Sequence, residues 1–94
     1  MNDARTASAP SPLLALHQRL QGDTPVLSAW IGQDSHAAST LGRLPFDAIT
    51  FDLQHSRLDL ADAVLGIALA AAVGQPAVVR IPVGEFQTAS RVLD

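Results

Sequence analysis

The sequence predicts an α/β fold in which parallel strands alternate with helices. Three apolar runs have the length of β-strands, and a helix-like stretch separates each run from the next; the runs are Pro25–Ile31, Ala48–Gln54 and Ala77–Ile81. Apolar strands that alternate with helices are typical of a parallel sheet covered by helices. A doubly wound sheet has the same alternation, but no G-x-G-x-x-G turn follows the first run, so the dinucleotide-binding version of that fold lacks its phosphate site.

The spacing of the strand ends favours a barrel. Trp30, His55 and Arg80 lie 25 residues apart, each at or near the end of one apolar run. A (β/α)8 barrel places eight strand–helix units in roughly 200–250 residues, and its chemistry lies at the C-terminal ends of the strands. The chain has 94 residues, and we therefore expect the first three βα units of a TIM (β/α)8 barrel, incomplete in this chain, over residues 13–94.

The N-terminal part predicts a tail and a short helix. Residues 1–12 are rich in Ala, Ser and Pro, and we expect them to form a flexible tail. Four leucines then recur with helical spacing, and Gly22 follows them as a stop, which predicts a helix over Pro12–Gln21. We expect this helix to cover the bottom of the barrel.

The first unit combines a strand with a short helix. The strand is expected over Val26–Ile31. Either Asp34 or Ser35 is expected to cap the helix that follows, because both residue types accept hydrogen bonds from free amides at a helix start. This helix runs through Leu41 and is expected to end at Gly42.

The second unit has the clearest pattern, because two kinds of residue alternate along its strand. Ile49, Phe51 and Leu53 share one face, whereas Thr50, Asp52 and Gln54 share the other. In a barrel the large apolar set packs outward under the helices, which places Asp52 and Gln54 near the upper mouth. The next helix is expected to begin at Asp59 and to end at Gly74.

The third unit begins with a β-branched run, which predicts a strand over Ala77–Ile81. Pro82 and Gly84 then turn the chain, and a last helix is expected over Glu85–Leu93.

Composition excludes several kinds of chemistry and partner. The net charge of −3 and the absence of a basic stripe imply no nucleic acid and no anionic membrane as partner. All six basic residues are Arg, and without a Lys the chain cannot form a Schiff base; without Cys it has no thiolate nucleophile. The longest apolar stretch, Ala63–Val73, is far shorter than the roughly 20 residues that span a bilayer, so we expect a cytoplasmic protein.

Three segments carry a resemblance to a known family. Residues 46–55 read Phe-Asp-Ala-Ile-Thr-Phe-Asp-Leu-Gln-His, residues 78–82 read Val-Val-Arg-Ile-Pro, and residues 29–32 read Ala-Trp-Ile-Gly. In this order they resemble the first three strands of the class II pyruvate aldolases of the HpcH/HpaI aldolase/citrate lyase family. The family's second strand ends in Asp-x-Glu-His, and its third ends in Val-Arg-Pro or Val-Arg-Ile-Pro. The resemblance covers residues 13–94, about the first third of a family member.

The resemblance implies a metal-dependent carbon–carbon lyase that cleaves a 4-hydroxy-2-oxo acid or a 2-keto-3-deoxy sugar acid into pyruvate and an aldehyde. His55 matches the family histidine that moves protons through a metal-bound water, and Asp52 matches the aspartate that holds this histidine. Arg80 matches the arginine that binds the pyruvyl oxygen and stabilises the enolate. Trp30 matches an aromatic residue near the substrate, although a packing role is an equal alternative for it.

The chemistry of these residue types agrees with the implied roles. Retro-aldol cleavage leaves negative charge on the pyruvate oxygen, and a fixed guanidinium stabilises that charge best in a water-poor pocket. A histidine has an ordinary pKa of about 6.5 and therefore exchanges protons at neutral pH. The other two histidines, His17 and His36, are expected on the surface and receive no role.

The resemblance also implies a cofactor that this chain does not bind alone. The family holds a divalent metal ion (Mg, Mn or Co) through a Glu and an Asp on later strands, so no metal ligand is expected here. Gln54 stands where many relatives have Glu. Asp59 and Asp62 do not replace the ligands, because they lie in the first turn of a helix, where the helix dipole accounts for them. The expected partners are a small 2-oxo acid substrate and, for the complete enzyme, further copies of itself.

Two other functions stay open. Three strands leave two edges of the sheet uncovered, and open edges invite pairing with other chains. The chain could therefore be a non-catalytic, truncated remnant that is unstable or pairs with a fuller homologue. A barrel lyase acting on citryl-CoA-type esters is a further alternative, which the motif at His55 disfavours. We expect the isolated chain of 94 residues to have no aldolase activity.

Overall fold

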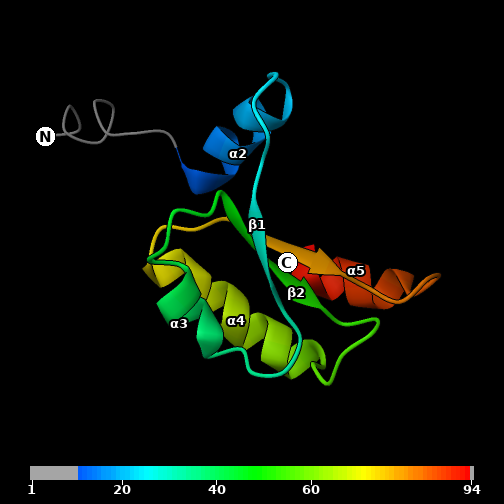
Figure 1. Cartoon of the computed structure of the whole chain (residues 1–94). Helices are drawn as coiled ribbons and strands as arrows, with labels where there is room; N and C mark the ends of the chain where they lie inside the picture. The colour runs from blue at the N-terminus through cyan, green and yellow to red at the C-terminus, as the bar shows by residue number, and fades with distance from the viewer. Residues whose placement is uncertain (1–10, 94) are drawn as a thin grey trace, which may run out of the picture.

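The computed structural model describes residues 11–93, which form a parallel sheet with helices along it (Figure 1). The elements are α2 (Pro12–Leu20), β1 (Ser28–Ile31), α3 (Ala37–Leu41), β2 (Ala48–Asp52), α4 (Leu60–Ala72), β3 (Ala77–Arg80) and α5 (Phe86–Leu93). The three strands lie in the order β1-β2-β3, which is the order in which the chain reaches them. The predicted α/β class with parallel strands is confirmed.

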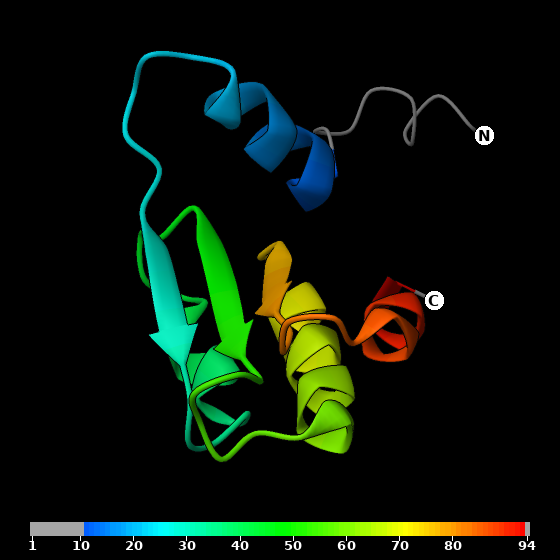
Figure 2. The ribbon, with the colours of Figure 1, turned by 90° about the vertical axis from the view of Figure 1, so that its right-hand side faces the viewer.

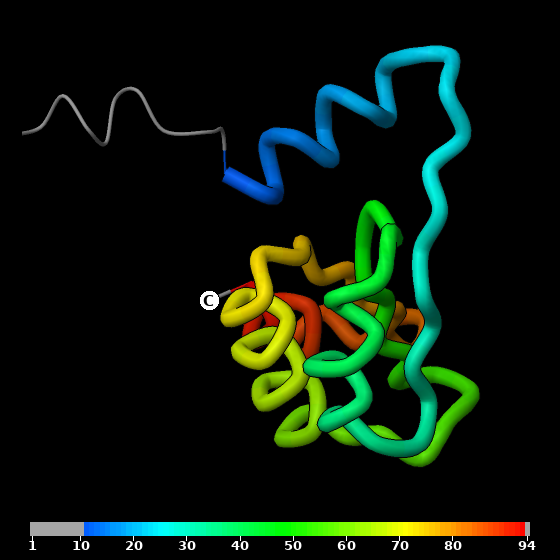
Figure 3. Tube along the Cα trace, turned by 60° about the vertical axis from the view of Figure 1, so that its left-hand side comes forward, coloured from blue at the N-terminus to red at the C-terminus, as the bar shows by residue number. Residues whose placement is uncertain are grey.

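The two faces of the sheet differ as the alternation along β2 predicts. Ile49 and Phe51 are fully buried on the face that α3 and α4 cover, and they form the core together with Ala29 and Ile31 of β1. The register places a second set of residues on the opposite face: Ser28, Trp30, Ala48, Thr50, Asp52, Val78 and Arg80. Helices α3 and α4 run side by side and contact each other (Figure 3). The apolar set therefore lies beneath the helices, and the polar set lies away from them.

Helix α2 lies beyond the N-terminal ends of the strands (Figure 2), and none of its residues is buried. Ser11 caps it by accepting a hydrogen bond from the Leu14 amide, so the predicted tail over residues 1–12 ends within the first turn of α2; residues 1–10 lie outside the described residues. Arg19 pairs with Asp47 at 3.1 Å, and Asp47 also accepts a hydrogen bond from the Leu27 amide at 2.9 Å. The ion pair therefore ties α2 to the start of the sheet.

The start of α3 differs from the prediction, because neither expected residue occupies the capping position. His36 is the N-cap residue, and its side chain makes no cap hydrogen bond. Asp34 accepts a hydrogen bond from the His36 amide at 2.9 Å, just ahead of the helix. The buried hydroxyl of Ser35 donates instead to the carbonyl of Asp62 at 2.7 Å, and it thereby joins the loop after β1 to α4.

Helix α4 begins at a capping box, which corrects the prediction that the helix dipole alone accounts for its two acidic residues. Asp59 Oδ1 accepts a hydrogen bond from the Asp62 amide, and Asp62 Oδ2 accepts one from the Asp59 amide, each at 2.9 Å. The two carboxylates therefore satisfy backbone amides that the first turn leaves free. Gly74 follows the helix with a φ of 76°, a left-handed conformation that glycine adopts without a steric penalty.

All three strands are shorter than predicted. The first begins at Ser28, the second ends at Asp52 and the third ends at Arg80. For β2 the cause is visible: the Asp52 carboxylate accepts hydrogen bonds from the amides of Gln54 and His55, which turns the chain out of the sheet. A polar side chain thus overrides the apolar alternation at this point.

Candidate functional site

An ion pair joins the C-terminal ends of β2 and β3. The register sets Asp52 directly beside Arg80, and both side chains lie on the face that the helices leave open. Arg80 Nε donates to Asp52 Oδ1 at 3.0 Å, and Arg80 Nη2 donates to Asp52 Oδ2 at 2.6 Å. Two parallel hydrogen bonds of this kind fix the plane of the guanidinium as well as its position.

The carboxylate of Asp52 is held from the backbone side as well. Its Oδ1 atom also accepts hydrogen bonds from the amides of Gln54 at 2.9 Å and His55 at 3.2 Å. The hydroxyl of Ser56 donates to the Asp52 carbonyl and accepts from the amide of Leu58, so the loop after β2 is tied to the strand end. The loop amides thus serve Asp52 and do not form a cradle for a ligand anion.

These contacts keep Asp52 ionised. The hydrogen bonds from the Arg80 side chain are the main cause that holds the pKa of Asp52 well below its ordinary value, and the amides of Gln54 and His55 lower it further. Partial burial opposes this shift, because it disfavours the charged carboxylate. In turn, the carboxylate raises the pKa of Arg80. The site therefore contains a pair that is charged at neutral pH.

The ring of Trp30 contacts the guanidinium of Arg80. The Arg80 Cζ atom lies 5.0 Å from the centroid of the Trp30 ring, within the range of a cation–π contact. The ring lies outside the buried core, since 56% of the surface of Trp30 is exposed. Trp30 therefore contacts Arg80 and does not belong to the buried core.

His55 lies in the loop at the same end of the sheet, between the end of β2 at Asp52 and the start of α4 at Leu60. It is exposed, and its link to Asp52 runs through its backbone amide, not through its imidazole. The expected carboxylate–imidazole contact is thus replaced by the pairing of Asp52 with Arg80. The neighbouring Gln54 is half-buried. The structure brings Trp30, Asp52 and Arg80 into one cluster and places His55 on the loop beside it.

Sequence reasoning missed two parts of this cluster: the pairing of Asp52 with Arg80 and the role of Ser56. The pairing had a signal, because both residues end neighbouring strands and share a face in the parallel alignment. Ser56 had no signal in strand periodicity, because its role depends on the turn that Asp52 creates. The remaining histidines stay apart from the cluster: His17 is exposed on α2, and His36 contacts Asp34 at 3.0 Å.

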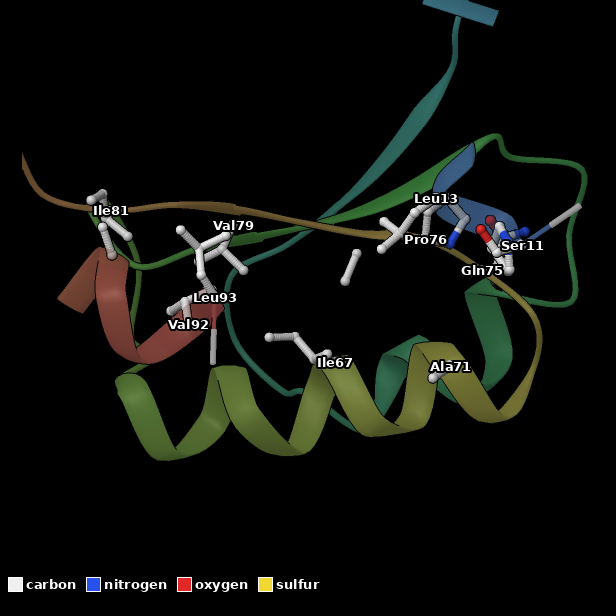
Figure 4. Close-up of a pocket in the computed structure, with 13 residues that line it drawn as sticks. Ser11, Leu13, Ile67, Ala71, Gln75, Pro76, Val79, Ile81, Val92 and Leu93 are labelled. Atoms are coloured by element: carbon white, nitrogen blue, oxygen red, sulfur yellow. The ribbon is translucent and has the colours of Figure 1, made fainter. Parts of the chain in front are cut away.

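A separate groove of about 700 Å³ lies between α4, α5 and β3 (Figure 4). Its walls include Ile67 of α4, Val79 of β3 and Val92 of α5, and no acidic, basic or histidine side chain lines it. Val79 points to the opposite face of the sheet from Arg80, since the two residues are adjacent on one strand. The groove therefore lacks the groups needed for proton transfer or charge stabilisation, and the ionic cluster is the candidate site.

The part of the chain that the structure describes does not offer a ligand set for a metal ion. Across residues 11–93 no group of three or more His, Asp or Glu side chains gathers. Asp52 does not fit such a role alone, because both of its carboxylate oxygens already accept hydrogen bonds from Arg80. What the cluster offers is a fixed, planar cation, and the exposed residue His55 contacts the cluster through its backbone amide. Over the same residues, no helix is long and apolar enough to cross a membrane.

Comparison of the chain with family models, with curated proteins and with solved structures finds no match.

Proposed function

We propose that this chain is the N-terminal part of a (β/α)8-barrel carbon–carbon lyase that cleaves a 4-hydroxy-2-oxo acid or a 2-keto-3-deoxy sugar acid into pyruvate and an aldehyde. The observation that carries the proposal is the cluster at the C-terminal ends of the strands, where Asp52 and Trp30 hold the guanidinium of Arg80. Chemistry at this end of the strands is what a barrel enzyme requires.

The arrangement of the strands supports the barrel part of the proposal. A barrel adds its strands in chain order and keeps its helices on the outer face, so that the inner face remains free for side chains. The order β1-β2-β3 and the common face covered by α3 and α4 agree with this pattern. A doubly wound sheet places helices on both faces instead.

The chemistry assigned to Arg80 follows from charge. Cleavage of the carbon–carbon bond leaves an electron pair on the pyruvyl fragment, which becomes an enolate with negative charge on oxygen. A guanidinium already fixed in position stabilises this oxygen without having to reorganise. His55, exposed on the adjacent loop, is assigned the transfer of protons to and from the reacting oxygen.

A divalent metal ion would polarise the oxo and carboxylate oxygens of the substrate in such an enzyme. The described residues do not offer a ligand set for it, and we propose that later strands of the complete enzyme supply the ligands, as the resemblance implies. These residues contain no Lys that could form a Schiff base, and the metal-dependent route that we propose follows from the resemblance of the strand-end motifs.

The proposal is tested by the binding of oxalate, a planar dianion that resembles the enolate of pyruvate. Trp30 is the single tryptophan of the chain and lies over Arg80, so its fluorescence reports on the site directly. We expect a saturable change in fluorescence with oxalate and with pyruvate. Arg80→Lys should weaken oxalate binding by about tenfold or more, the loss expected when a charge-assisted hydrogen bond is removed.

Arg91→Lys is the matched control, because Arg91 is exposed on α5. It should bind oxalate as the parent chain does. A parent chain that folds but gives no saturable response, or equal losses in the two variants, would refute the proposed site.

A non-catalytic remnant is the second candidate, and the open sheet favours it. Within the described residues, β1 and β3 each have a free edge. We expect such a remnant to have no affinity for a substrate analogue, because selection for catalysis would no longer preserve the binding residues. Binding of oxalate at Arg80 therefore favours the lyase, whereas association without oxalate binding favours the remnant.

A further inference from the structure

The carboxylate of Asp52 is placed to orient the side chain of Arg80 and not that of His55. Its carboxylate contacts the guanidinium through two hydrogen bonds, whereas its contact with His55 is made by the backbone amide. A carboxylate that oriented the histidine would instead accept a hydrogen bond from a ring nitrogen. The geometry thus points away from the role that the sequence resemblance implies for Asp52.

The carboxylate occupies one side of the guanidinium and leaves another side free. An arginine side chain has five N–H groups in a fixed planar arrangement. Asp52 takes the pair formed by Nε and Nη2, which leaves the outer edge between Nη1 and Nη2 for a ligand. The Arg80 Cζ atom lies over the ring of Trp30, 5.0 Å from its centroid, and 38% of the Arg80 side chain remains exposed. A planar pair of oxygens can therefore approach this outer edge.

Asp52 could in principle compete with a ligand for Arg80, but its own contacts argue against this. The residue is buried in the last position of β2, and its Oδ1 atom accepts hydrogen bonds from two backbone amides. A carboxylate held in this way cannot swing aside when a ligand arrives without breaking the turn after β2. It therefore acts as a fixed support.

We propose that Asp52 is a positioning residue that aims the outer edge of the Arg80 guanidinium at the planar oxygen pair of a 2-oxo acid, and that it does not orient the imidazole of His55. This assignment rests on the proposed function for the identity of the ligand. The support itself acts before any ligand binds.

Two substitutions separate the position of the carboxylate from its charge. Asp52→Asn removes the charge but keeps the shape, whereas Asp52→Glu keeps the charge and displaces the carboxylate by one methylene. If Asp52 positions Arg80, both variants weaken oxalate binding by about tenfold, as is typical for residues that orient a binding group. If the carboxylate competes with the ligand, Asp52→Asn binds oxalate more tightly and Asp52→Glu binds it as the parent does.

Asp47→Asn is the matched control. Asp47 also pairs with an arginine and precedes the same strand, but it lies at the N-terminal end of β2. This variant should bind oxalate as the parent does, which shows that loss of an ion pair next to β2 is not sufficient to weaken binding.

A nuclear magnetic resonance measurement tests, without any ligand, whether Asp52 holds the guanidinium of Arg80. In the parent chain the Hε–Nε signal of Arg80 should be resolved and protected from exchange with water, because this N–H donates to Asp52. The signal should be lost in Asp52→Asn, while the ring signals of His55 at neutral pH keep their positions. Displacement of the His55 ring signals with an unchanged Arg80 signal would overturn the assignment.

These outcomes also distinguish the inference from the proposed function. A parent chain that shows the protected Arg80 signal but does not bind oxalate contradicts the proposed function alone. If the parent chain binds oxalate and both Asp52 variants bind it equally tightly, the positioning role alone is contradicted.

Discussion

At the scale of single residues, the pair formed by Asp52 and Arg80 controls both the local fold and the candidate chemistry. The carboxylate ends β2 by accepting the amides that follow it, and the same carboxylate fixes the guanidinium. Trp30 adds a contact above the plane. One acidic side chain thus links the end of a strand to the orientation of a cation.

The lowered pKa of Asp52 predicts how stability depends on pH. The unfolded chain has the ordinary, higher pKa and therefore takes up the proton first as pH falls. The contribution of the pair is complete above the ordinary pKa and is lost progressively as pH falls from about 5 towards 2. Asp34 and Asp59, whose pKa values are lowered chiefly by backbone amides, add to the same trend.

Urea unfolding of the parent and of Asp52→Asn at several pH values measures this contribution. The difference in the free energy of unfolding between the two proteins should be largest near neutral pH and should shrink as pH falls. A difference that stays constant across this range would show that Asp52 does not stay ionised below its ordinary pKa.

At the scale of elements, the sequence predicts the order and kind of each helix and strand but not all of their ends. Periodicity predicts α2, α4 and β2 because apolar spacing reflects which face is buried. The ends depend on polar contacts that periodicity does not contain. Asp52 stops β2 two residues early, and Ser35 bonds to α4 instead of capping α3. The spacing of the strand ends predicted where the candidate residues lie, and the family resemblance implied their roles, whereas the pairing of Asp52 with Arg80 depended on the register between strands.

The contact between α4 and β2 depends on a glycine. Gly66 is buried against the ring of Phe51, and a Cβ atom added at this position would lie 2.3 Å from Phe51 Cε1. Gly66→Ala should therefore lower the free energy of unfolding by about 1–3 kcal/mol, the usual cost of overpacking a core. The higher helix propensity of Ala, worth about 1 kcal/mol, offsets only part of this loss.

Chemical denaturation of three variants checks this contact. Gly22→Ala is the matched control, because its new Cβ would meet the nearest atom, the Arg19 carbonyl oxygen, at an ordinary 3.6 Å. Gly66→Ala combined with Phe51→Leu should regain part of the lost stability, since the smaller side chain makes room. Equal stability of Gly66→Ala and the parent would show that α4 does not pack this closely.

At the scale of the whole molecule, the sheet has a covered face and an open one. The strand order and the parallel direction follow from the alternation in the sequence, and both are observed. Three strands do not show whether a sheet closes into a barrel, so the barrel stays a proposal. Metal binding likewise stays a proposal, because no group of three or more His, Asp or Glu side chains gathers among the described residues. The open face carries exposed Trp30 and Val78, so the described residues leave apolar surface uncovered.

The open edge of β3 predicts concentration-dependent self-association. Val78 lies on this edge strand and is 41% exposed, and a charge placed on an edge strand disfavours pairing with another chain. In sedimentation velocity, the average mass of the parent should rise with concentration, and Val78→Lys should reduce this rise. Val64→Lys on the exposed side of α4 is the matched control and should associate as the parent does. Equal association of the two variants would place the contact elsewhere.

The most direct test of the central claim is to map where oxalate binds by nuclear magnetic resonance of the chain labelled with ¹⁵N. The account predicts that oxalate shifts the indole signal of Trp30, the Hε–Nε signal of Arg80 and the amides of residues 53–58, with one common saturation curve. Shifts that cluster in the groove between α4 and α5, or that follow no saturation curve, would contradict it.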